Sequence, residues 1–141
     1  MLRTAMTSLP AGRLSRVRRA GHGGRVRLPV PPDLSTPLGC DAVGLPARHG
    51  LRLLSHLTRP GCVFADADLW WWIVPSQSNL GLPWPSPARY VTGAYVPATH
   101  PRLIHSPEGT APYTPPIPLY LMVCRLAGTA PVWSSASWRR P

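Results

Sequence analysis

Apolar and polar positions separate most clearly between Pro46 and Pro60, where they predict a short amphipathic helix over residues 47–59. At 100° per residue, one arc of the helical wheel holds leucines and the opposite side holds basic residues. The apolar arc contains Leu51, Leu53, Leu54 and Leu57, and the basic side contains Arg48, Arg52, His56 and Arg59. The dipeptide Pro60-Gly61 is a strong stop signal and ends the predicted helix.

The next apolar segment, residues 62–74, contains three consecutive tryptophans at positions 70–72. Neither a period of 2 nor a period of 3.6 places all three indoles on one face, so the run fits a buried strand and a short helix equally well. Residues 90–96 alternate weakly as a strand with Gly93 in the middle, and residues 119–126 fit a strand or a helical turn. One or two brief strands are therefore expected.

Proline interrupts most of the remaining chain, which contains 20 Pro and 12 Gly. Pro29, Pro31, Pro32 and Pro37 favour extended or polyproline geometry, so we interpret this part of the chain as a linker. Prolines are also dense between positions 83 and 118, and proline donates no hydrogen bond to a sheet. The expected fold class is a mostly irregular, intrinsically disordered chain with a short helix near 47–59 and no stable globular fold.

Four segments follow from these changes in composition. They are an Arg-rich basic segment at 1–32, a Pro-rich linker at 33–46, a basic helix plus Trp-rich apolar segment at 47–74, and a Pro-rich irregular region at 75–141. Hydrophobic residues make up 44% of the chain and charged residues 14%, unlike a polar, highly charged disordered protein. We expect the chain to collapse without building long, mutually supporting elements.

The composition also bears on the origin of the chain. All 15 basic residues are arginine, and Ala, Gly, Pro and Arg, whose codons are GC-rich, dominate. Such a bias arises from nucleotide content without selection for a fold. The first functional hypothesis is therefore that the chain is the product of a GC-rich, recently arisen, overprinted or dubious reading frame with no inferable biochemical activity.

A second hypothesis comes from the charge, which is +10 overall and concentrated near the N-terminus. No acidic residue precedes Asp33, and guanidinium forks in such a segment suit phosphates and carboxylates. We therefore expect an Arg-mediated binding module for acidic proteins, RNA or an anionic membrane surface. The candidate polyanion-binding residues are Arg3, Arg13, Arg16, Arg18, Arg19, Arg25 and Arg27.

A third hypothesis is a small mitochondrial or membrane-associated protein. Residues 1–20 are Arg-rich, acid-free and contain Ser and Thr, as mitochondrial presequences do, although the same residues suit a nuclear retention segment. The Trp cluster next to a basic helix could anchor at a membrane interface. No apolar run approaches the roughly 20 residues of a membrane span, so we expect no transmembrane segment and, by default, an intracellular protein.

Candidate chemistry is sparse. Cys40, Cys62 and Cys124 form no CxxC pair, and the cluster of Cys40, His49, His56 and Cys62 matches no zinc spacing. The chain has no Gly-x-Ser-x-Gly motif, no phosphate-binding Gly-rich loop and no lysine. We expect no enzymatic activity, no cofactor and no metal.

Overall fold

The computed structural model describes residues 24–132, and in it the Trp-rich segment forms a β-hairpin. Its antiparallel strands are β3 (Val63–Ala65) and β4 (Leu69–Val74). Asp66 holds the turn between them, because its Oδ1 accepts hydrogen bonds from the N–H groups of Asp68 and Leu69, both at 2.8 Å. An aspartate that bonds its own backbone a few residues ahead is a common turn former.

The strand β4 carries side chains into two separate hydrophobic clusters. Trp72 packs with Val43 and Leu45 on one face of the sheet, and Trp71 packs with Phe64 on the other. Trp71 and Trp72 are both fully buried. Because a strand alternates its side chains between two faces, consecutive indoles can fill two cores at once. The ambiguous run is therefore a strand buried on both sides.

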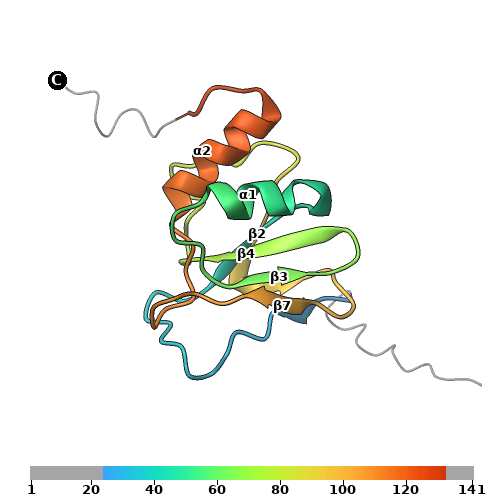
Figure 1. Ribbon diagram of the computed structural model, residues 1–141, viewed down its shortest axis with the longest axis vertical. Helices are drawn as coiled ribbons and strands as arrows, with labels where there is room; N and C mark the ends of the chain where they lie inside the picture. Colours follow the sequence, from blue (N-terminus) through green and yellow to red (C-terminus); the bar gives the residue numbers. More distant parts are fainter. Residues whose placement is uncertain (1–23, 133–141) are drawn as a thin grey trace, which may run out of the picture.

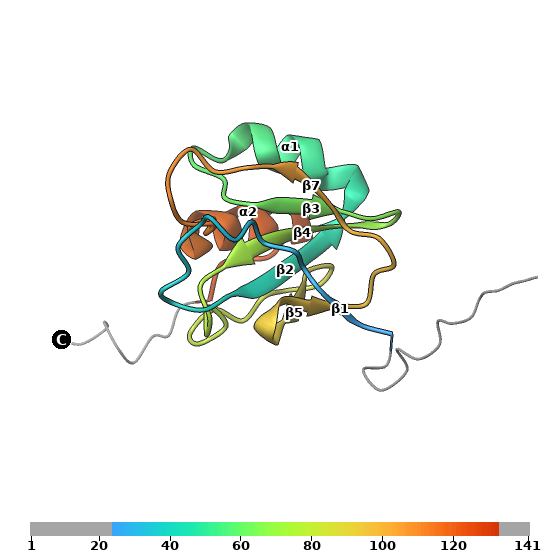
Figure 2. The same cartoon turned by 90° about the horizontal axis from the view of Figure 1, so that it is seen from below.

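Five antiparallel strands form the main sheet, in the order β5-β2-β4-β3-β7 (Figure 2). The additional strands are β2 (Asp41–Pro46), β5 (Arg89–Val91) and β7 (Arg102–His105). In the register of the central pair, Gly44 lies opposite Trp71. The strand β2 comes from the segment that was expected to be a linker, and it is one of the three inner strands.

Two helices cover one face of the sheet, as Figure 1 shows. They are α1 (Gly50–His56), preceded by the 3-10 turn η2 (Ala47–His49), and α2 (Pro116–Ala127). Their buried residues Leu53, Leu119 and Val123, together with Leu57 directly after α1, pack in the cluster of Trp72. A helix is present within the predicted segment 47–59, but α1 covers only Gly50–His56, and Leu51, assigned to its apolar arc, is 72% exposed.

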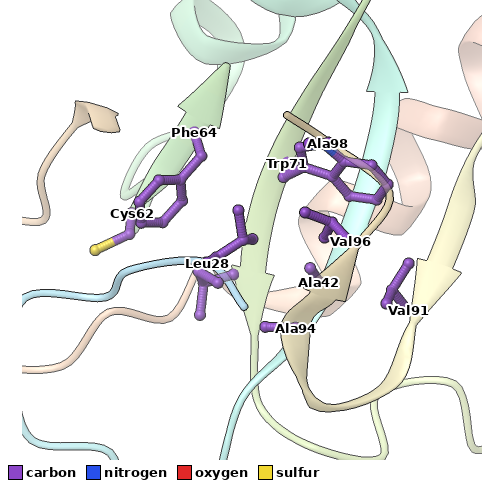
Figure 3. Close-up of a cluster of buried hydrophobic side chains, with 10 residues drawn as sticks. Leu28, Ala42, Cys62, Phe64, Trp71, Val91, Ala94, Val96 and Ala98 are labelled. Carbon is purple, nitrogen blue, oxygen red and sulfur yellow. The ribbon is translucent and has the colours of Figure 1, made fainter. Parts of the chain in front are cut away.

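A two-stranded antiparallel ribbon covers the opposite face. Its strands are β1 (Val26–Arg27) and β6 (Tyr95–Val96), and the turn η3 (Thr92–Ala94) leads from β5 into β6. Leu28, Ala94 and Val96 from this layer are buried against Phe64 and Trp71 (Figure 3). The sheet is thus sandwiched between helices on one side and the ribbon with its flanking loops on the other.

Asp41, at the start of β2, is a buried carboxylate that organises the Pro-rich segment around it. Its Oδ2 accepts hydrogen bonds from the Gln77 N–H at 2.9 Å and from the Tyr90 hydroxyl, and its Oδ1 accepts one from the Gly93 N–H at 2.8 Å. Gln77 and Gly93 have positive φ angles of 67° and 70°. Buried charges persist when they are fully hydrogen-bonded, so this carboxylate holds three distant segments together.

These elements correct the expectation of a mostly irregular, intrinsically disordered chain without a stable globular fold, which is wrong for residues 24–132. The high proline content of the whole chain does not apply to the centre of the sheet. Residues 41–74 encode its three inner strands and contain only Pro46 and Pro60. Most other prolines of the described region lie in loops.

The structure also assigns the two other segments for which the sequence suggested regular structure, residues 90–96 and 119–126. Residues 90–96 are divided between β5, η3 and β6, whereas residues 119–126 belong to α2. Pro116 and Pro118 lie in the first turn of α2, where a missing backbone N–H costs no helical hydrogen bond. Among residues 24–132, no helix has the length and apolar character needed to cross a membrane.

Gly44→Ala tests the central strand pair. A Cβ at position 44 would overlap the Cζ3 atom of the fully buried Trp71 indole, which has no space to move aside. We expect the free energy of unfolding, measured by chemical denaturation, to fall by about 2 kcal/mol. Gly109→Ala is the matched control, since nothing lies within 4 Å of a Cβ there, and it should change stability by less than about 0.5 kcal/mol. Equal stabilities of the two variants would contradict the packing of Trp71 on β2.

Alkaline pH should destabilise the fold. Burial raises the pKa values of Cys40, Cys62, Tyr90, Tyr113 and Tyr120, that of Cys62 to about 11. In the unfolded chain these groups ionise near their ordinary values of 9.0 for Cys and 10.0 for Tyr, so above about pH 9 unfolding releases protons that the folded state retains. The contribution of these groups to the free energy of unfolding should therefore be constant below about pH 8 and fall as the pH rises further.

The measurement is the denaturation midpoint at neutral pH and near pH 10. For Tyr90 burial is the main cause of the raised pKa, followed by the hydrogen bond to Asp41. Tyr90→Phe removes this titrating group, so the difference between its two midpoints should be smaller than in the wild-type chain. A midpoint that does not move with pH in the wild-type chain would be inconsistent with these buried, protonated groups.

Candidate nucleic-acid interface

The β1–β6 ribbon presents one face to the core and the other to solvent. Val26 lies opposite Val96, and Arg27 lies opposite Tyr95. Val96 is fully buried in the core, whereas Arg27 and Tyr95 are exposed. Because residues directly opposite each other in a strand pair point to the same side, the apolar pair anchors the ribbon and the Arg–Tyr pair faces outward.

Two arginines contact Tyr95, which is 42% exposed. Arg25 donates a hydrogen bond from Nη1 to the Tyr95 carbonyl oxygen at 3.0 Å. The Cζ atom of Arg27 lies 6.0 Å from the centroid of the Tyr95 ring, within the range of a cation–π contact. The three residues, which we call the Arg–Tyr patch, combine fixed positive charge with an accessible aromatic ring.

A cavity of about 410 Å³ adjoins the patch, with Arg27 among its lining residues. The other walls are largely apolar and come from the segment after β1 and from Ala94 before β6, with Leu28, Val30 and Leu34 among them. Cys40 also lines this space, and burial raises the pKa of its thiol, an effect that nearby Arg27 opposes. The cavity therefore offers apolar surface beside a cation.

The charge distribution of the folded region favours anionic partners. Every arginine within residues 24–132 is exposed. Two of the chain's five acidic residues are committed to the fold: Asp41 is buried, and both oxygens of Asp66 accept hydrogen bonds, with Oδ2 receiving one from Trp71 Nε1 at 3.2 Å. The outer surface thus presents more positive charge than negative.

The structure brings together Arg25 and Arg27 from the predicted polyanion-binding set. Arg3, Arg13, Arg16, Arg18 and Arg19 lie outside the described residues. Tyr95, which connects the two arginines, was not singled out from the sequence. Its position in the weakly alternating residues 90–96 was the available signal, but its pairing with Arg27 spans most of the folded chain.

The tryptophan cluster proposed as a membrane anchor has another role. Trp71 and Trp72 are fully buried, and Trp70 is half-buried against the helix-side cluster. Burial of this kind fits the buried strand that the sequence offered for this run. The indoles of Trp71 and Trp72 contribute to the core and not to an exposed anchor.

The rejected metal cluster is also separated in space. Cys62 is buried on the ribbon side of the sheet, whereas His56 ends α1 on the helix side, with its Nδ1 at 2.8 Å from the Arg52 carbonyl oxygen. Within the part of the chain that the structure describes, no three His, Cys, Asp or Glu side chains are grouped to hold a metal ion.

Comparisons of this chain with protein-family models, with curated proteins and with solved structures find no match. The observations that bear on function are therefore the geometry and charge of the chain itself. Among them, the Arg–Tyr patch is where the predicted basic residues and an exposed aromatic side chain meet.

Proposed function

We propose that this protein binds single-stranded RNA through the Arg–Tyr patch. Arg25 and Arg27 would contact backbone phosphates, and Tyr95 would stack on an unpaired base. The observation that carries the proposal is that two exposed arginines contact one exposed tyrosine, Arg25 at its backbone carbonyl oxygen and Arg27 at its ring. Proteins that bind single strands combine positive charge along the backbone with aromatic side chains on which bases stack.

An unpaired strand suits this surface better than a duplex or an acidic protein. Bases expose their faces only where they are unstacked, and an exposed ring such as Tyr95 can reach them there. An acidic peptide would use the guanidinium groups but has no need of the ring. The neighbouring cavity, which Arg27 lines together with apolar side chains, gives a second flat group a place to insert.

The basic N-terminal segment adjoins the patch in sequence. Arg3, Arg13, Arg16, Arg18 and Arg19 precede β1, and no acidic residue interrupts them. Sequence-independent contacts of arginine with phosphates release counterions and make affinity depend on salt. This segment would add affinity without base specificity, while Tyr95 supplies the preference for a single strand.

The test is fluorescence anisotropy with a labelled oligouridine of about a dozen nucleotides, a length within the site sizes of single-strand binding folds. Tyr95→Ala should raise the Kd about ten-fold through loss of stacking, while Tyr95→Phe, which keeps the ring, should stay close to wild type. The double variant Arg25→Gln/Arg27→Gln should bind more weakly and reduce the log–log salt slope by about 1.4, since each phosphate contact contributes about 0.7.

The matched control is Arg48→Gln/Arg52→Gln, which removes the same charge from η2 and α1 on the opposite face of the sheet. Its salt slope should equal that of the wild-type chain. If both double variants bind alike, the affinity reflects net charge and the patch has no special role. If the wild-type chain does not bind the oligonucleotide, the hypothesis of a product without a defined activity gains support.

A further inference from the structure

The helices α1 and α2, which lie over the same face of the sheet (Figure 1), expose large apolar side chains to solvent. Leu51 of α1 is largely exposed, and Ile117 and Leu121 of α2 are 50% and 40% exposed. Leu53 and Leu119 are fully buried in the helix-side cluster. Each exposed residue is two positions from one of these leucines, a rotation of about 200° on a helix, so all three side chains point away from the sheet.

The composition of α2 is unusual for a helix at a protein surface. Its only charged residue is Arg125. Ile117, Leu121 and Arg125 are spaced by four residues, so they form one stripe along the outer side of the helix. A surface helix usually carries polar and charged residues on its solvent side, whereas a helix that is apolar on both sides is covered by another structure. The outer side of α2 therefore indicates a contact with an apolar environment.

Positive charge lies on the same side of the sheet. Arg52 is two residues after Gly50, which faces the Trp70 ring on β4, so the Arg52 side chain points away from the sheet. Arg52 and Arg125 are both exposed, and η2, α1 and α2 contain no acidic residue. We use the name outer helix face for Leu51, Arg52, Ile117, Leu121 and Arg125.

Two acidic residues lie near the ends of α1 and not within the helices. Asp68 adjoins η2, because its carbonyl oxygen accepts a hydrogen bond from the Ala47 N–H at 2.9 Å. Glu108 lines a cavity together with Arg59, which follows α1. Within the described residues, neither carboxylate forms an ion pair with an arginine of the outer helix face. The charge of this face is therefore available to an anionic partner.

We propose that the outer helix face binds an anionic lipid membrane. Its apolar side chains would enter the boundary between headgroups and acyl chains, while Arg52 and Arg125 would contact lipid phosphates. Peripheral membrane proteins combine exposed apolar side chains with basic residues in this way, and each basic residue near an anionic surface strengthens binding. Arginine keeps its charge among the headgroups while its methylene groups lie along the apolar surface.

A membrane fits this face better than a second copy of the chain or an acidic protein. In a symmetric dimer the face would meet itself and bring arginines towards arginines without a carboxylate between them. A partner helix needs a groove for a row of its side chains. The space between the end of α1 and the start of α2 is only about 110 Å³. A lipid surface needs no groove.

The experiment is co-sedimentation of the full chain with lipid vesicles at about 150 mM salt. One set of vesicles is pure phosphatidylcholine, and the other contains about 30% phosphatidylserine. The chain should partition at least about ten-fold more strongly onto the anionic vesicles, and Arg52→Gln/Arg125→Gln should reduce that partition about twenty-fold. Equal partition onto the two kinds of vesicle, or no binding to either, would overturn the proposal.

Matched variants locate the binding, because the arginines before β1 would also attract anionic lipid. Arg25→Gln/Arg27→Gln removes the same charge from the ribbon side and should reduce the partition much less than Arg52→Gln/Arg125→Gln. An equal reduction by the two double variants would show that only net charge matters and would contradict the proposal.

Insertion of α2 is tested by two leucines of similar exposure. Leu103 of β7 is 38% exposed but lies opposite Phe64, which is buried in the ribbon-side core, so Leu103 points to the other side of the sheet. Leu121→Gln should reduce the partition about five-fold through loss of apolar contact with lipid, whereas Leu103→Gln should leave it unchanged. Equal partition of the two variants would contradict insertion.

Folding and self-association are checked on the same variants. Glutamine is a good helix former and Leu121 is exposed, so Leu121→Gln should keep the wild-type melting temperature. If it melts lower, Ile117→Gln replaces it, and Leu121→Phe, which stays apolar, should bind vesicles like the wild-type chain. A wild-type dimer in analytical ultracentrifugation that dissociates in Leu121→Gln would assign the face to a second copy and overturn the proposal. Failure of RNA binding would leave the vesicle result unaffected.

Discussion

The alternation of Trp71 and Trp72 across β4 is the constraint on which the rest of the structure depends. The Trp72 indole fills the core under α1 and α2, and the Trp71 indole fills the core under the β1–β6 ribbon. The Trp71 ring lies over Gly44 of β2, where the absence of a side chain leaves space for it. Because Val96 is buried in the second core, the outward face of the ribbon, with Arg27 and Tyr95, has a fixed position.

A shortage of carboxylates shapes both the fold and its surface. Asp41 and Asp66 use their oxygens to order backbone that has no regular structure of its own, around residues 77 and 93 and at the hairpin turn. Each replaces hydrogen bonds that a longer sheet or helix would have supplied. Few acidic residues then remain to pair with the arginines, all of which are exposed within residues 24–132. The skewed composition of the chain thus becomes a positively charged surface around a well-packed core.

Sequence patterns predicted the helix, which depends on neighbouring residues, but not the sheet, which depends on pairing between distant segments. The helix at α1 followed from leucine spacing, although Leu51 lies outside the core because a helix of two turns meets the sheet along a narrow stripe. The sheet was missed because its strands are short and its pairs join distant segments, so proline density outweighed the weak strand signals in residues 62–74 and 90–96. Arg25 and Arg27 could be selected from charge alone, whereas the placement of Tyr95 beside Arg27 depends on tertiary contacts.

The most direct test of the two-core sheet is solution NMR of the full chain at neutral pH. The Gly44 Hα protons should be shifted strongly upfield by the Trp71 ring and show NOEs to it, and the Ile73 amide, which donates to the Cys62 carbonyl oxygen at 3.1 Å, should exchange slowly. Gly44 Hα protons at unstructured positions, together with an Ile73 amide that exchanges as fast as in a free peptide, would contradict the account.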